Sequence, residues 1–463
     1  MLTGIAHQIP KIRPPLDPEF QPAVLANRAF AAGARADAKG LDVRLALEQA
    51  DGSVFHFQRR IFPLAARGGD NLFYLERLLK FLLWSRGGFR IYFNGPHELG
   101  VSLRHHFQET ATGRFDAQLM GERIYERPFE VVMTEDLPPV HSTTKPLGRH
   151  CDGCRIGFDL GASDRKVAAV LDGRAVFSEE TLWNPVGQSD PQWHFDQIMD
   201  SLQQAAKHLP RVDAIGGSSA GVYVNNHVRV ASLFRGVPPD LFQQRVRNLF
   251  AELRQAWGNI PFDVVNDGEV TALAGSMSLG KNGVLGIAMG SSQAAGFVTP
   301  DGTITSWLNE LAFAPIDYNP TAPVDEWSGD RGCGVQYFSQ QGVSRLMAVA
   351  GIECAEEEPL PERLKRVQQL MAEGDGRARK IYESIGVCLG YAVAHYVEFY
   401  EFSHVLILGR VTSGEGGEVI LQHAREVLRA EFPDLARSIE FHVPDEKDKR
   451  HGQAVAAASL PAI

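Results

Sequence analysis

The sequence predicts an α/β protein with two lobes and a cleft between them, preceded by a small α+β domain. One scheme occurs twice, with strands at the start and crossover helices after them, first from Arg155 and again from Val284. Each half begins with a hairpin whose turn consists of small residues, Gly161-Ala162-Ser163 and then Gly290-Ser291-Ser292. Backbone N–H groups in such turns can approach a ligand closely, so the pair could hold a polyphosphate from both sides of a cleft.

Length and composition limit the class of protein. A chain of 463 residues is too long for one simple core and predicts two or three domains. Its 44% hydrophobic and 22% charged residues are typical of a soluble globular protein. The net charge of −10 argues against nucleic acid or acidic membranes as partners, because both need clustered cations. Five cysteines, no signal peptide and no apolar stretch long enough to span a membrane predict a cytoplasmic protein.

The first third of the chain predicts an arm and a domain. Prolines in residues 1–41 favour an extended arm, with a short helix near 23–36. Residues 42–150 are expected to form the additional α+β domain and a linker to the first lobe. A hairpin around Asp51-Gly52, one clear helix at 72–84 and strands at 89–93 and 126–133 make up this domain. Its order loosely resembles the start of the first lobe, but we consider an internal duplication less favoured than independent origin.

The two lobes are expected at 151–268 and 269–444, with about 445–463 rejoining the first. In the first lobe we expect three antiparallel strands, a strand at 212–215 with a Gly216–Gly221 loop, and one helix over 239–257. In the second lobe we expect a hairpin from Val284, several helices and a strand at 404–408.

Chemistry-bearing residues lie at the ends of predicted strands. Asp159 ends a strand, Ser163 lies in the turn and Lys166 follows it, which are the parts needed to hold a metal-bound phosphate; the alternative is an ordinary hairpin. Asn266-Asp267 ends one strand and begins a helix, where a carboxylate could take a proton from an attacking alcohol, or merely cap the helix.

Two further motifs are weaker. Leu408-Gly409 and the small residues after it could let an adenine ring lie against the backbone, or could simply connect a strand to a helix. Cys151 and Cys154 form one Cys-x-x-Cys pair with no second pair, so free thiols are favoured over a zinc or redox site.

The order of these motifs resembles the ROK family of sugar kinases and repressors, within the actin-like/hexokinase superfamily. The resemblance covers about residues 155–460 and implies a two-lobed actin-like ATPase (ribonuclease H-like) fold. The matching segments, in family order, are Phe158–Ser163, Val265-Asn266-Asp267 with Ala272 and Ala274, Gly290–Gly296, Asn309–Phe313, Gly332-Cys333 with Tyr337 and Ser339, and Leu408-Gly409.

The resemblance also implies roles for individual residues. Asp267 would be the general base, and Asn266 and Glu310 would contact the sugar. Asp159 would lie near Mg²⁺, and the ATP phosphates would lie near Gly161, Ser163, Gly290, Ser291 and Ser292, with the adenosine near Gly409.

Several positions depart from the family pattern. Phe313 replaces a histidine that binds sugar and zinc, Val335 replaces a sugar-contacting glutamate, and only Cys333 remains of the zinc loop, so we expect no structural zinc. Ser292, Ala294 and Arg410 replace glycines, and the turn before Lys166 differs in length from the family turn by about one residue, which leaves Lys166 without an assigned role.

These observations favour an ATP-dependent sugar kinase that uses ATP and Mg²⁺. The alternative is a non-catalytic sugar- or nucleotide-binding or regulatory protein on the same fold, since fold alone does not decide function. A repressor is the least supported form of this alternative, because residues 42–135 show no basic recognition helix. A homodimer is a further expectation by analogy with the family.

Overall fold

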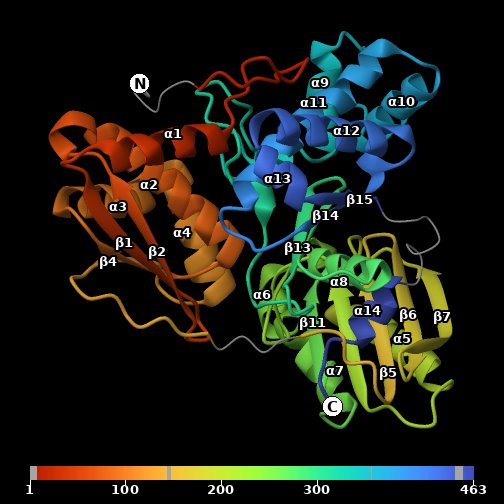
Figure 1. Ribbon diagram of the computed structural model, residues 1–463. Coiled ribbons are helices and arrows are strands. Elements are labelled where there is room, and N and C mark those ends of the chain that lie inside the picture. The colour runs from red at the N-terminus through yellow and green to blue at the C-terminus, as the bar shows by residue number, and fades with distance from the viewer. Residues whose placement is uncertain (1–7, 143–146, 356, 444–451) are drawn as a thin grey trace.

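The computed structural model describes residues 8–142, 147–355, 357–443 and 452–463. The start of the predicted arm, Thr143-Thr144 of the predicted linker and residues 445–451 of the predicted return segment lie outside this description. Figure 1 shows three parts: an N-terminal domain, a first lobe built around β5, and a second lobe that carries β12–β15 and most of the later helices. The predicted α/β class with two lobes and an additional domain is confirmed.

The N-terminal domain is a mixed sheet covered by helices. Its sheet has the order β2-β1-β3-β4, with β1 antiparallel to both neighbours and β3 parallel to β4. The bounds are α1 (Ala23–Ala36), β1 (Leu41–Glu48), β2 (Val54–Ile61), α2 (Leu64–Arg86), β3 (Arg90–Asn94), α3 (His97–Glu109), α4 (Ala111–Gln118), the π-helical η1 (Leu119–Tyr125) and β4 (Glu130–Met133). Because β3 runs antiparallel to β1, whereas the corresponding strand of the first lobe runs parallel to β5, this sheet is not a copy of that lobe.

The expectation of one clear helix in residues 42–135 was wrong. Three further helical segments, α3, α4 and η1, lie between β3 and β4. Their sequences are rich in polar residues and carry a weak apolar pattern, with Leu99, Leu103 and Phe107 buried on α3 and Met120 and Ile124 on η1. Packing against the rest of the domain therefore stabilises these helices more than their own periodicity does.

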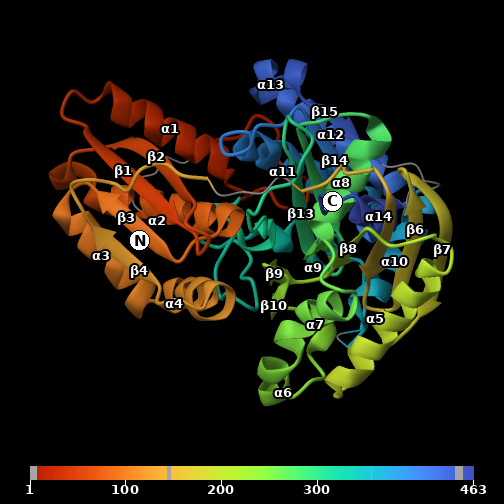
Figure 2. The ribbon, with the colours of Figure 1, turned by 90° about the horizontal axis from the view of Figure 1, so that it is seen from below.

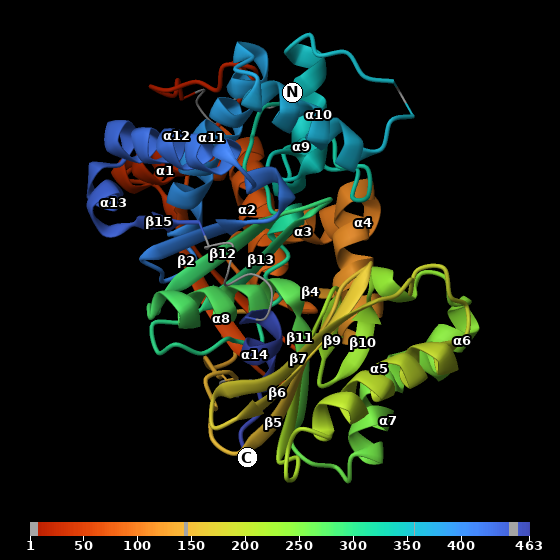
Figure 3. The same cartoon turned by 90° about the vertical axis from the view of Figure 1, so that its right-hand side faces the viewer.

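The first lobe has the sheet order β11-β8-β5-β6-β7, in which β5, β6 and β7 are antiparallel and β8 and β11 run parallel to β5. Its elements are β5 (Cys154–Leu160), β6 (Asp164–Leu171), β7 (Arg174–Leu182), α5 (Pro191–Ala206), β8 (Ala214–Ser219), β9 (Val222–Val224), β10 (His227–Val230), η2 (Ser232–Phe234), α6 (Pro239–Gln244), η3 (Val246–Asn248), α7 (Leu249–Ala256) and β11 (Phe262–Asn266). The last helix, α14 (Gly452–Ala458), packs on β5, β6 and β8 and against α8 (Figure 3).

Two local predictions for the first lobe were wrong. Gly216 and Gly217 belong to strand β8 rather than to a loop. A Cβ atom on Gly216 would lie 1.7 Å from the backbone oxygen of Ala457, so glycine is required there for α14 to pack on the strand. The predicted helix over 239–257 is interrupted at Arg245, whose backbone leaves the helical region, and Val246 is buried after it.

The second lobe has the sheet order β13-β12-β14-β15, with β13 antiparallel and β14 and β15 parallel to their neighbours. Its elements are α8 (Asp267–Leu279), β12 (Val284–Met289), β13 (Gln293–Val298), η4 (Leu311–Phe313), η5 (Gly334–Gln336), α9 (Gln340–Val349), α10 (Leu360–Ala372), α11 (Gly376–Tyr396), β14 (His404–Leu408), η6 (Arg410–Thr412), α12 (Glu415–Glu431), α13 (Pro433–Ser438) and β15 (Glu440–His442).

One continuous apolar core runs through the N-terminal domain and the second lobe. Phe81 of α2 stacks on Phe399 with ring centroids 4.1 Å apart, and Trp84 packs on Phe313 at 4.2 Å. The arm also lies on the second lobe, where Phe20 is fully buried against Tyr337. Figure 2 shows the N-terminal sheet beside the two lobes, so this region is an integral part of the fold and not a separate appendage.

Among the described residues, no helix combines the length and apolar character that crossing a membrane requires.

Candidate functional site: a carboxylate-lined cleft

The carboxyl ends of the first-lobe strands bring the predicted catalytic residues together. Asp159 on β5 is opposite Ser218 on β8, and Ser218 is opposite Val265 on β11, so Asp159 and the end of β11 share one sheet edge. The Ser218 hydroxyl donates a hydrogen bond of 2.6 Å to Asp159. Lys166 Nζ lies 3.5 Å from Asp159 Oδ2 and 3.1 Å from Asp164 Oδ1. Burial nevertheless raises the pKa of Asp159 above its ordinary value.

The helix cap at the start of α8 is Asn266, and the role of Asp267 as a general base stays a prediction. Asn266 is the cap of α8: its Oδ1 accepts a bond of 2.7 Å from the Gly268 N–H, and its Nδ2 donates to the Gly221 carbonyl at 2.7 Å. Asp267 also accepts the Gly268 N–H, at 3.0 Å, through Oδ1. Burial, and then repulsion from Asp159, raise the pKa of Asp267 to about 6.

Glu310 completes the group, and the N-terminal domain holds it in place. The last carbonyl groups of α2 accept hydrogen bonds from N–H groups of the segment before η4. Trp84 O accepts from Glu310 N at 2.9 Å, and Ser85 O accepts from Asn309 N at 3.0 Å. These bonds satisfy the carbonyls that a helix end leaves free. Burial and the charge of Asp267 raise the pKa of Glu310 to about 7, so the two carboxyl groups are electrostatic neighbours.

Glu269, which the sequence patterns did not single out, is the fourth acidic residue. It is buried on the first turn of α8, where it accepts bonds from the Asn309 side chain and from the Phe297 N–H at 3.3 Å. Burial raises its pKa to about 8. Its signal in the sequence was the Asp-Gly-Glu run at the helix start, which is also ordinary for a helix N-terminus. We call Asp159, Asp267, Glu269 and Glu310 the cleft carboxylates.

Of the four cleft carboxylates, Glu269 and Glu310 line a cavity of about 370 Å³, where the three parts of the protein meet. The lobes contribute Asn266, Glu269 and Glu310. Trp307 and Tyr223 add aromatic surfaces, and the N-terminal domain contributes the segment Gln49–Asp51 and Tyr125. The contributions of the N-terminal domain could not be read from the sequence, because they depend on long-range packing.

The two small-residue turns are both surface features at strand ends. Ala162 and Ser163 are exposed in the first, and Ser291 and Ser292 in the second. Gly161 N–H donates to Asp164 O and Gly290 N–H to Ser292 O, each at 2.9 Å. No hydrogen bond or ion pair among the described residues joins one turn to the other. Joint binding of a phosphate by both turns therefore stays a prediction.

Gly409 follows β14 beside the second turn. Its backbone has φ +99°, and a Cβ atom there would lie 2.6 Å from the Met289 carbonyl. Both observations require glycine at this position. Because glycine has no side chain, a ligand can approach the backbone closely at this strand end.

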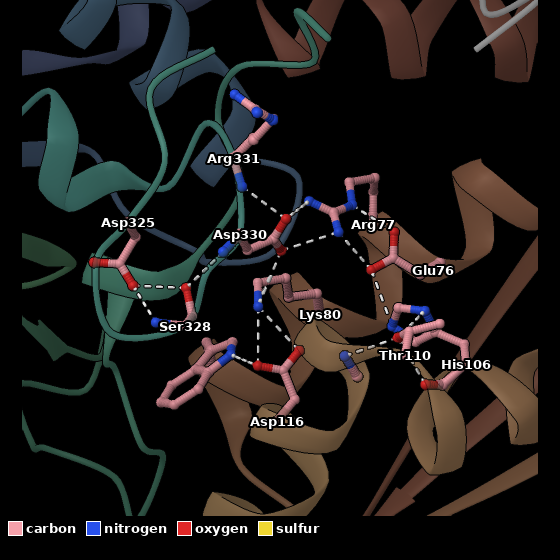
Figure 4. Close-up of polar contacts among 12 residues, drawn as sticks. Glu76, Arg77, Lys80, His106, Thr110, Asp116, Asp325, Ser328, Asp330 and Arg331 are labelled. Carbon is pink, nitrogen blue, oxygen red and sulfur yellow. Dashed lines mark hydrogen bonds and ion pairs between the residues drawn. The ribbon is translucent and has the colours of Figure 1, made fainter. Parts of the chain in front are cut away.

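An interdomain ion network occupies the region of the departures from the family pattern (Figure 4). Phe313 packs against the aromatic rings of Trp84 and Phe115, and Cys333 is buried with Ala312 and Val335. Beside them, Asp330 forms ion pairs with Arg77 at 3.0 Å and with Lys80 at 3.1 Å. An aromatic contact and a buried charge network therefore connect this loop to α2.

The interdomain ion network consists of Glu76, Arg77, Lys80, Asp116 and Asp330. Arg77 and Lys80 hold the pKa of Asp330 well below its ordinary range, although burial acts in the opposite direction. Lys80 also donates to both oxygens of Asp116, at 2.9 and 3.0 Å. Burial outweighs these bonds and raises the pKa of Asp116 above its ordinary value.

Comparison with known proteins identifies the fold. No family model and no curated protein matches the sequence. Among solved structures, a ROK hexokinase from Thermus thermophilus is 16% identical with a TM-score of 0.52, and the match covers 66% of this chain and 96% of that one. A ROK family transcriptional regulator, described as a homologue of the E. coli MLC protein, is 18% identical with a TM-score of 0.53, over 67% of this chain and 79% of that one.

The chain has the ROK fold. Its two lobes have the fold of these two ROK structures, as the motif order predicted. Each of the two ROK matches leaves about a third of the chain uncovered, a share similar in size to residues 1–150. Because the two similar structures are a kinase and a regulator, the ROK fold by itself leaves the activity open.

Proposed function

We propose that this ROK-fold protein is a kinase that transfers a phosphoryl group from ATP to a hydroxyl group of a sugar or sugar-like substrate. The observation that carries this proposal is Asp267. It lies partly buried at the first turn of α8, between Asp159 and Glu310, with a pKa near 6. A carboxylate with such a pKa is ionised at neutral pH and basic enough to accept a proton from an attacking alcohol.

The residues around Asp267 fix its position. Its Oδ1 is held by the Gly268 N–H, which leaves Oδ2 to accept the proton. Both polar atoms of the Asn266 side chain are engaged with the backbone, so we assign Asn266 to positioning Asp267 rather than to direct contact with the sugar. Glu310 lines the cavity and would accept a hydrogen bond from a substrate hydroxyl.

The donor set fits a divalent cation and a nucleotide. Burial and then repulsion from Asp159 raise the pKa of Asp267, and a hard cation with oxygen ligands would relieve this repulsion. Asp159 would hold Mg²⁺, which supplies charge neutralisation to the transferring phosphoryl group when bound. Gly161, Ser163, Gly290, Ser291 and Ser292 would face the phosphates, and Gly409 the adenosine.

The cavity favours an uncharged or cationic acceptor. The described residues that line it include Asp51, Asp263, Glu269 and Glu310, but no lysine, arginine or histidine. A sugar phosphate or a sugar acid would find no cationic side chain among these lining residues to pair with. Trp307, whose ring also stacks on Phe297 and contacts the Arg86 guanidinium, and Tyr223 add aromatic surface to the lining of the cavity.

The alternative, a non-catalytic sugar or nucleotide binder, is favoured by the similarity to a ROK regulator. In the N-terminal domain, however, α4 and η1 bury Asp116, Met120 and Ile124 against the domain. They are therefore not arranged as an exposed basic recognition helix.

A coupled assay of ADP release over a panel of neutral sugars, amino sugars and polyols tests the proposal. Wild type should turn over at least one of them, and Asp267→Asn should lower kcat by about a thousandfold or more, because general-base catalysis is lost while binding is kept. Asp196→Asn, on the exposed surface of α5, is the matched control and should retain full turnover. Sugar or ATP binding without ADP release by wild type would instead support the non-catalytic binder.

A further inference from the structure

Two histidines and a glutamate lie together on the edge of the second-lobe sheet, away from the cleft carboxylates. His404 begins β14, and Glu440 and His442 belong to the neighbouring strand β15. The two strands are parallel, with His404 opposite Glu440 and Leu406 opposite His442. Glu440 and His442 are two residues apart, so they share one face of the strand, next to His404.

Three ligand atoms of these residues form a small triangle. His404 Nδ1 lies 3.1 Å from His442 Nε2 and 3.4 Å from Glu440 Oε2, and the third side, from His442 Nε2 to Glu440 Oε2, is 3.8 Å. A hydrogen bond between the two imidazoles would account for one side of this triangle. It would not account for a carboxylate that faces the same two nitrogen atoms.

The triangle has the size of a coordination face. The point that lies in the plane of these three atoms and is equidistant from them is about 2.0 Å from each atom. This distance is the length of Zn–N and Zn–O bonds. Two imidazoles and one carboxylate are a common zinc ligand set, with the fourth position left to water or an exogenous ligand. Among the described residues this is the only group of at least three such side chains with convergent ligand atoms.

The surroundings suit metal entry. The side chain of Glu440 is 63% exposed, and a surface hollow of about 340 Å³ borders Glu440 and His442.

We propose that His404, Glu440 and His442 form a binding site for a divalent transition-metal ion with the coordination preferences of zinc. The site is separate from the proposed Mg²⁺ site, because Asp159 lies on β5 in the first-lobe sheet and His404 begins β14 in the second-lobe sheet. Within the second lobe, His404 lies at the opposite end of β14 from Gly409, roughly 16 Å along the strand. A bound ion cross-links β15, a strand of three residues at the edge of the sheet, to β14. It therefore stabilises an edge that has only one strand as a partner.

Metal binding to the untagged full chain tests the proposal. After treatment with a chelator, the protein is titrated with ZnCl₂ against a chromophoric zinc indicator. Wild type should bind one ion more than His442→Ala, whose affinity for that ion should fall by about a hundredfold or more. Glu440→Gln should lower the affinity for the same ion by about tenfold or more. Because Glu440 is exposed, this substitution should leave the fold unaffected.

Two controls separate this site from other metal-binding groups. His208→Ala removes an exposed histidine that stacks on Phe177, and it should leave zinc affinity unchanged. Asp267→Asn should also retain the ion, so the outcome is independent of the proposed kinase activity. The proposal is overturned if wild type binds no zinc at micromolar concentration, or if both His442→Ala and Glu440→Gln bind it as wild type does.

Discussion

The protein contains two groups of buried carboxyl groups that differ in their neighbours. In the interdomain ion network, Arg77 and Lys80 lie against Asp330 and keep it ionised. Among the described residues, the cation paired with a cleft carboxylate is Lys166, beside Asp159, and the pKa values of Asp267, Glu310 and Glu269 rise to about 6, 7 and 8. Burial raises the pKa of carboxyl groups in both sets, and at Asp330 two cations reverse this effect. A single lysine does not reverse it at Asp116 or at Asp159.

This difference separates a structural role from a chemical one. A buried ion pair fixes geometry and is costly to break, and here it attaches α2 to the loop that carries Asp330. Buried carboxyl groups without cations destabilise the fold when they ionise, and such groups are typical of sites that transfer protons or bind cations. The two groups also meet structurally, because α2 supplies both Arg77 and Lys80 and, at its end, the carbonyl groups that hold the Glu310 segment.

The largest expected effect comes from Asp330→Asn. It leaves Arg77 and Lys80 buried without their shared anion, and the free energy of unfolding should fall by about 3–5 kcal/mol in urea denaturation. The pKa of Asp330 is lowered, so its contribution is complete above the ordinary value of 3.8 and is lost only as pH falls through the still lower folded-state pKa. The difference in the free energy of unfolding between wild type and Asp330→Asn should therefore be constant from pH 5 to 9.

The control for this substitution is Glu362→Gln, which breaks an exposed pair with Lys365. It should change stability by less than about 0.5 kcal/mol. A deficit in Asp330→Asn as small as that of the control would show that the interdomain ion network does not hold the domain to the lobe.

The next effect, expected for Glu269→Gln, depends on pH, unlike that of Asp330→Asn. The folded-state pKa of Glu269, about 8, lies above its ordinary value of 4.5, so the folded protein binds more protons between these values and wild-type stability falls as pH rises. The variant has no ionisable group at this position, so its stability does not fall for this reason as pH rises. Its stability relative to wild type should therefore increase by up to about 1.4 kcal/mol per pH unit, levelling off above pH 8.

Equilibrium unfolding of both proteins at pH 5, 6, 7, 8 and 9 measures this difference. A constant offset between Glu269→Gln and wild type across that range would contradict a raised pKa at Glu269.

The smallest effect concerns the first turn. Ser163→Glu places a negative charge on an exposed turn that is predicted to face the ATP phosphates, so ATP affinity should fall about tenfold in calorimetry. Ser178→Glu, on the exposed strand β7, is the matched control and should bind ATP as wild type does. Equal affinity of the two variants would contradict the placement of the phosphates.

Sequence patterns predicted the elements that depend on local periodicity and on motif order. The hairpin around Asp51-Gly52, the strands that end at Asp159 and Asn266, and the repeated lobe scheme all agree with the structure. The patterns failed where distant packing decides the conformation: Gly216 and Gly217 appeared to be a loop because the helix that requires them, α14, lies more than two hundred residues further along.

The candidate site was predictable only where motif order identifies its residues, and not where distant packing decides their surroundings. Asp159, Asn266, Asp267 and Glu310 have chemical types and positions that the motif order identifies. Glu269 looked like an ordinary residue of a helix start, and its burial arises only from Asn309 and Phe297. The attachment of Glu310 to the end of α2 joins residues more than two hundred positions apart, which no local pattern reveals.

The pH dependence of ADP release tests the central claim most directly. With a sugar that wild type turns over, kcat/KM should rise with pH through an apparent pKa near 6, as Asp267 loses its proton, and remain high above it. The same ascending limb should be absent from the residual rate of Asp267→Asn. A rate independent of pH between 5 and 8, or full turnover by Asp267→Asn, would contradict the assignment of Asp267 as the general base.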